Sequence, residues 1–92
     1  RPALILAISP SRHHDLLLAL ISSRLHQATP GFDEIINTSD SDYITTGLKA
    51  ASLIRLGRLT SVESSVINAR LGNISPERLI HIKNILINWL KK

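Results

Sequence analysis

An arginine and a pair of serines stand at the ends of two apolar segments. Arg1 lies two residues before the apolar run Ala3 to Ile8, and Ser22 and Ser23 directly follow the apolar run Leu16 to Ile21. If the two runs form neighbouring antiparallel strands, a hairpin brings the start of the first beside the end of the second. A guanidinium beside a hydroxyl provides a fixed cation and a hydrogen-bond donor, which suits a phosphodiester. We therefore predict a phosphate-directed site at this edge of a small sheet.

The chain offers few residues for other kinds of catalysis. Cysteine is absent, which excludes disulfides and thiolate metal sites, and the 7 acidic residues are scattered without the spacing of a carboxylate metal site. His13 and His14 are an alternative metal pair, but adjacent residues in a strand or turn usually point apart. Glycine-rich phosphate loops and nucleophile elbows are also missing. We expect an enzyme of this sequence to work without a metal or a cofactor.

Metal-free RNA cleavage fits these constraints. The 2′-hydroxyl of the substrate is the nucleophile, so the protein needs only a cation for the phosphate, a proton acceptor and a proton donor. The net charge of +4 and the pI near 10.1 favour an anionic partner. A basic surface that serves only for solubility is the alternative explanation of the charge.

Length and composition indicate one domain over residues 1–92. The mass is 10.2 kDa, and aromatic residues make up 3% of the chain, so the core must be aliphatic. Both apolar runs are apolar at every position, which is typical of strands buried on both faces. So short a chain cannot easily cover both faces itself, and we expect a symmetric homodimer. No run approaches the roughly 20 residues of a membrane span, and we expect a cytoplasmic protein.

Turn residues and breakers define five further elements between the first strand and the last helix. They are a polar turn at Ser9–Asp15, a short edge strand at Phe32–Ile36, a short turn at Tyr43–Thr46 that Gly47 ends, a strand at Ser52–Val62 with a bulge or close backbone approach at Gly57, and a helical turn within Glu63–Gly72 that Gly72 ends.

The last element carries the clearest signals. Ser75 is an N-cap residue, Pro76 occupies the first helical position, and Glu77 lies in the first turn. An apolar stripe recurs with helical spacing at Leu79, Ile82, Leu86 and Trp89 or Leu90. Strands followed by one amphipathic helix predict an α+β domain, with the helix packed on a small barrel-like sheet.

Four segments together resemble the PemK/MazF family of toxins from type II toxin–antitoxin systems. They occur in family order along nearly the whole chain, at Arg1–Leu6, Ile21–Arg24, Gly47–Leu56 and Arg70–Glu77. The resemblance implies an SH3-like antiparallel β-barrel, a homodimer, and metal-independent, sequence-selective cleavage of single-stranded RNA. It also implies inhibition by a cognate antitoxin.

The resemblance also implies roles for individual residues. Arg1 matches the catalytic arginine of the family, Ser22 a position where the family usually has threonine, and Arg55 a strand arginine that contributes to the site in some members. As residues that contact RNA we expect Ser23, Arg24, Lys49 and Arg58, with Arg12 as a further candidate for phosphate. Each of these side chains could instead be an ordinary strand-end or surface residue.

The sequence departs from the family pattern in two places. Some relatives carry an aspartate where this chain has Gly57, so the general base stays open. The family usually has an additional first strand and loop before the Arg-Pro pair, and we expect the chain to be part of a longer protein. Two other functions remain open: a gyrase-binding toxin like CcdB, in which Trp89 would matter, and an inactive dimeric interaction domain.

Overall fold

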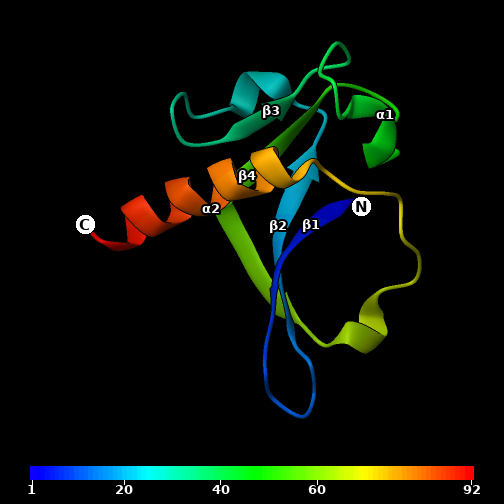
Figure 1. The fold of residues 1–92 in the computed structure, drawn as a ribbon, viewed down its shortest axis with the longest axis vertical. Helices are drawn as coiled ribbons and strands as arrows, with labels where there is room; N and C mark the ends of the chain where they lie inside the picture. The colour runs from blue at the N-terminus through cyan, green and yellow to red at the C-terminus, as the bar shows by residue number, and fades with distance from the viewer.

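The computed structural model describes all of residues 1–92 (Figure 1). Its elements in chain order are β1 (Ala3–Ile8), β2 (Leu16–Ser22), the 3-10 turn η1 (Leu25–Gln27), β3 (Glu34–Ile36), α1 (Tyr43–Thr46), β4 (Ser52–Val62), the 3-10 turn η2 (Ser64–Val66) and α2 (Pro76–Leu90). The strands form one antiparallel sheet in the order β1-β2-β4-β3. This curled half-barrel with a C-terminal helix confirms the predicted small α+β fold.

The strands occupy the predicted segments. β1 and β2 form the expected hairpin, with Ala3 opposite Leu20, and the Ser9 amide donates to the carbonyl oxygen of Asp15 at 2.7 Å. β3 is an edge strand, as predicted, but is limited to Glu34–Ile36. β4 is the longest strand and pairs with both β2 and β3, so it connects the two halves of the sheet.

Two register shifts curl the sheet. In the first hairpin, Leu6 is skipped between the pairs formed by its neighbours Ile5 and Ala7. Between β2 and β4, the adjacent residues Ala19 and Leu20 pair with Leu59 and Arg55. The irregularity predicted at Gly57 is therefore confirmed as a bulge, and bulges of this kind increase strand twist and bend.

Helix α2 covers one face of the sheet (Figure 1). It begins as predicted, since the Ser75 hydroxyl accepts a hydrogen bond from the Arg78 amide at 3.1 Å and Pro76 occupies the first turn. The core consists of seven buried aliphatic residues from the sheet and this helix: Leu6, Ala19, Ile36, Ile54, Leu56, Ile82 and Leu86. No helix in the structure combines the length and hydrophobicity that crossing a bilayer requires.

The segment between β4 and α2 differs from the prediction. Only Ser64–Val66 forms a helical turn, and Gly72 does not end it. Instead, the backbone at Gly72 lies against helix α1, because the Asn73 amide donates to the Thr45 carbonyl at 2.8 Å. A Cβ atom on Gly72 would lie 2.1 Å from that carbonyl oxygen, so only glycine permits this approach. Gly72 is therefore needed for a close backbone contact with α1, and not to end a helix as predicted.

Arg78 binds three carboxylates that lie far from it in the sequence. Its guanidinium forms ion pairs with Glu34 at 2.9 Å, Asp40 at 2.8 Å and Asp42 at 2.9 Å, and it also donates to the carbonyl oxygen of Ile35. The Arg78 side chain is only 12% exposed. The network therefore joins the start of α2 to β3 and to the loop before α1 in a largely water-excluded place.

These contacts shift the acid–base equilibria of the network. The hydrogen bond from Arg78 holds the pKa of Asp42 far below its ordinary value, although burial opposes this effect. The backbone hydrogen bond from Asn37, together with Arg78, lowers the pKa of Asp40. The hydrogen bond to Asp42 in turn raises the pKa of Arg78. A carboxylate with a lowered pKa in the folded state stabilises the fold only while it is ionised.

We predict that Gly72→Ala destabilises the protein by about 1–3 kcal/mol, because the new methyl group must displace the backbone of α1. Gly57→Ala is the matched control, since its Cβ would meet only the Phe32 ring at 3.6 Å. Urea unfolding monitored by circular dichroism measures both changes. Equal stability of the two variants would contradict the close approach.

We predict that the Asp42→Asn variant loses about 1–3 kcal/mol of unfolding free energy at neutral pH, where the charged hydrogen bonds that Asp42 accepts from Arg78 are intact. Because the pKa of Asp42 is lowered on folding, its contribution is complete above the unfolded pKa of roughly 4 and is lost as the pH falls below it. The difference between wild type and variant should therefore shrink as the pH falls from about 4 to about 2. A constant difference across this range in urea titrations would show that Asp42 is not part of an ionic network.

Candidate functional site

An open groove of about 1620 Å³ lies between the sheet and the segment that follows β4. Its walls come from β1, β2, β4 and residues 66–74. Seven of the eight residues predicted to act on or contact RNA line it: Arg1, Ser22, Ser23, Arg24, Lys49, Arg55 and Arg58. The volume exceeds the roughly 300–1,000 Å³ of ordinary small-molecule pockets, so an extended ligand suits the groove better.

The charged residues that line the groove are all basic. Six of the 11 basic residues line it, namely Arg1, Arg24, Lys49, Arg55, Arg58 and Arg70, and no aspartate or glutamate does. The four ion pairs of the protein all involve Arg78 or His81, so these six cations have no internal counter-ion. Uncompensated charges in a groove attract anionic chains.

The structure brings Arg1 and Ser22 to the same edge of the sheet. The Ile21 amide donates to the Pro2 carbonyl oxygen at 3.2 Å, and the register that pairs Ala3 with Leu20 places Arg1 opposite Ser22. The Ser22 Oγ accepts a hydrogen bond from the Arg24 amide at 3.0 Å. This leaves the hydroxyl proton of Ser22 free to donate to a ligand.

Arg55 enters the groove from β4, beside Leu20 of β2. Its guanidinium donates to Oε1 of Gln27 at 3.2 Å, and Gln27 comes from η1, directly after the Ser22–Arg24 turn. Nothing in the sequence indicated this hydrogen bond, because the two residues lie 28 positions apart. Gln27 thus links the edge that carries Arg1 and Ser22 to the arginine of β4.

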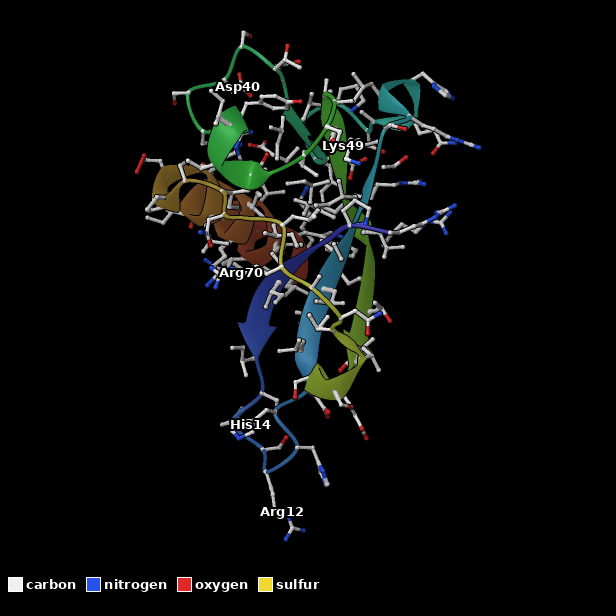
Figure 2. All side chains as sticks on the ribbon, turned by 90° about the vertical axis from the view of Figure 1, so that its right-hand side faces the viewer. Arg12, His14, Asp40, Lys49 and Arg70 are labelled. Carbon is white, nitrogen blue, oxygen red and sulfur yellow. The ribbon has the colours of Figure 1, made fainter.

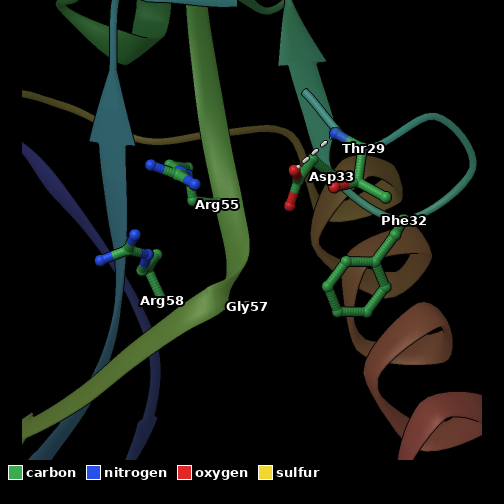
Figure 3. A pocket seen from close by; sticks show the side chains of 6 residues that line it. All are labelled: Thr29, Phe32, Asp33, Arg55, Gly57 and Arg58. Carbon is green, nitrogen blue, oxygen red and sulfur yellow. Dashed lines mark hydrogen bonds between the residues drawn. The ribbon is translucent and has the colours of Figure 1, made fainter. Parts of the chain in front are cut away.

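A smaller hollow of about 140 Å³ lies at the bulge of β4, next to the groove (Figure 3). Its lining comprises Thr29, Phe32, Asp33, Arg55, Gly57 and Arg58. Figure 3 shows the side chains of Arg55 and Arg58 on the same side of the strand. The hollow therefore shares its two cations with the groove.

Other candidates lie outside the groove. Arg12 is at the tip of the β1–β2 hairpin together with His14, far from Lys49 and Arg70 (Figure 2), so the structure does not bring it together with the other candidates for phosphate. Trp89 is also outside, and its ring packs edge-to-face on Phe32 with centroids 5.1 Å apart. Arg70 was not among the predicted site residues, but it lies in the wall of the groove, and its guanidinium contacts the Asn73 side chain.

Comparison with protein families shows which kind of protein this chain is. Residues 1–90 match the model of the PemK-like, MazF-like toxin of type II toxin-antitoxin system. The chain belongs to this family of toxins. A search of curated proteins found no match. Family membership confirms the resemblance seen in the four sequence segments, and it gives this PemK/MazF-like chain the role of a toxin whose partner is an antitoxin.

Proposed function

We propose that this toxin is a metal-independent, sequence-selective endoribonuclease that binds single-stranded RNA in the groove. The observation that carries the proposal is the set of six unpaired cations that line the groove without one carboxylate. Phosphate contacts by lysine and arginine supply most of the affinity of such complexes. None of the lining residues is aromatic, so the guanidinium planes of the arginines are the surfaces on which unstacked bases of a single strand can stack.

Arg1 and Ser22 act on the scissile phosphate in this proposal. The Arg1 guanidinium stabilises the charge that develops on the phosphate during attack by the 2′-hydroxyl, and its planar fork can bond two oxygens. The Ser22 hydroxyl accepts from the Arg24 amide and donates its proton to a non-bridging oxygen. Arg55, held by Gln27, adds a second cation to the same groove.

The proposed assembly is a homodimer that an antitoxin inhibits. Ile5 and Ile8 are exposed on the first hairpin, by 43% and 62%, and their partners Leu18 and Leu16 place them on the same face of the sheet. A second copy of the chain would cover this apolar surface, which adjoins the groove at Ile5. The antitoxin would present an acidic, initially disordered segment to the basic groove and so compete with RNA. Binding there would block the cations that the proposed reaction uses.

The gyrase-binding function receives less support from the structure. The ring of Trp89 packs edge-to-face on Phe32, and Lys91 and Lys92, which follow it closely, add positive charge. A supercoiling assay with purified gyrase distinguishes the two functions. Inhibition of supercoiling in the absence of RNA cleavage would replace the ribonuclease proposal.

We predict that Arg1→Ala lowers the single-turnover rate of RNA cleavage by about 100- to 1,000-fold, because it removes transition-state stabilisation. The fold should be unaffected, since Arg1 is exposed and forms no ion pair. The assay uses mixed RNA in EDTA with mapping of ends, which should carry cyclic phosphates. Arg12→Ala, at the hairpin tip, is the matched control and should cleave normally. Full activity of folded Arg1→Ala would remove Arg1 from the mechanism.

We predict that Ser22→Thr keeps the activity and that Ser22→Ala lowers it by about tenfold, because only the hydroxyl can donate to the phosphate while it accepts from the Arg24 amide. Rates under single-turnover conditions and melting temperatures are measured for all three proteins. If the three proteins cleave RNA at equal rates, Ser22 has no part in the reaction.

A further inference from the structure

Arg55 and Arg58 face the same groove although they are three residues apart on one strand. Side chains of a regular strand alternate between its two faces, so residues at an odd spacing point in opposite directions. Both arginines nevertheless line the groove and the adjoining hollow, and Figure 3 shows them on one side. Something must therefore break the alternation of β4 between them.

The β4 bulge breaks the alternation. Leu20 pairs with Arg55 and the adjacent Ala19 with Leu59, so three residues of β4 lie between consecutive pairs. Within this bulge the Leu56 amide donates to Oδ1 of Asp33 at 3.0 Å. The second carboxylate oxygen, Oδ2, accepts from the Thr29 amide at 2.8 Å. Asp33 thereby ties the bulge to the loop before β3.

Asp33 is also the only acidic residue in the hollow that the two arginines line. It forms no ion pair with either arginine, so its carboxylate is engaged by backbone amides. As a plain negative charge beside a phosphate site, it would repel RNA. Its hydrogen bonds indicate a different task, which is to hold the backbone from which both guanidinium groups project.

We propose that Asp33 is a positioning residue that fixes the β4 bulge and so turns Arg55 and Arg58 together toward one backbone phosphate of the RNA. Gln27 supports the arrangement by accepting from Arg55, while Arg58 is exposed and free to bind. Arg1 and Ser22 line the same groove, so this phosphate belongs to the same bound RNA strand as the scissile one. This inference rests on the proposed function, since it assigns a contact within the same RNA groove.

The test measures the affinity for a single-stranded RNA with 2′-O-methyl groups, which cannot be cleaved, at several salt concentrations. Asp33→Ala should weaken binding about tenfold, as expected when one charged hydrogen bond to the RNA no longer forms. The slope of log affinity against log salt should become shallower by about 0.7 for each phosphate that the variant no longer binds. Asp33→Asn, which keeps an acceptor for the Leu56 amide, should fall between wild type and Asp33→Ala.

Arg58→Ala and the double variant show whether Asp33 acts through the arginine. Arg58→Ala should weaken binding to a similar extent, and adding Asp33→Ala should cost less than it does in the wild-type background. Glu77→Gln, on the first turn of α2 and outside the groove, controls for the removal of one negative charge. Glu77→Gln should leave the salt slope unchanged and should not weaken RNA binding.

The outcomes separate the inference from the proposed function. Tighter binding by both Asp33 variants with an unchanged slope would show a merely repulsive charge, and additive effects in the double variant would show independent roles. Either result overturns the positioning role while wild-type RNA binding stands. If Asp33→Ala does not fold, the folded Asp33→Asn protein decides by the same criteria. Wild-type protein that binds no RNA would overturn both the inference and the proposed function.

Discussion

The ion network around Arg78 is the interaction on which the arrangement of the molecule depends. One guanidinium on α2 contacts Glu34 of β3 and both Asp40 and Asp42 of the loop before α1. Loss of one partner in such a largely buried network leaves uncompensated charge, so we expect removal of any one partner to loosen the contact between the three segments. The network also engages three of the 7 acidic side chains of the protein at a place away from the groove. None of the residues that line the groove is acidic. The same contacts that fasten the helix to the sheet thus leave the groove positive.

Two glycines extend this arrangement to the wall of the groove. Gly47 ends α1 in a left-handed conformation, and a Cβ there would lie 2.3 Å from the carbonyl oxygen of Leu71. Gly72 permits the reciprocal approach to the carbonyl oxygen of Thr45. Helix α1 directly follows the loop that Arg78 binds. The network therefore also fixes the position of residues 71–73, which pack against α1. This docking brings Arg70 to the groove, where its charge joins those of the sheet.

The fold was largely predictable because its main elements carry local signals. The cap at Ser75, the proline after it and the apolar stripe of α2 act within a few residues, and uninterrupted aliphatic runs define β1 and β2. The short helical turn predicted within Glu63–Gly72 is present at Ser64–Val66, but its predicted end at Gly72 is wrong, because a glycine that ends a helix and one that admits a neighbouring backbone look alike in a sequence. Only the carbonyl of Thr45, close to Gly72 in space, distinguishes the two cases.

The sequence by itself determined the main strands, the last helix and the edge at which Arg1 meets Ser22, because an antiparallel hairpin fixes which ends come together. Tertiary structure alone decided which side chains and backbone groups distant in the sequence bond to one another. Gln27 bonds Arg55 across 28 positions, Asp33 bonds the Leu56 amide across 23, and Arg78 bonds Asp42 across 36. No periodicity or cap encodes such pairs, because they form only when packing of the helix and curling of the sheet bring distant backbone segments into contact.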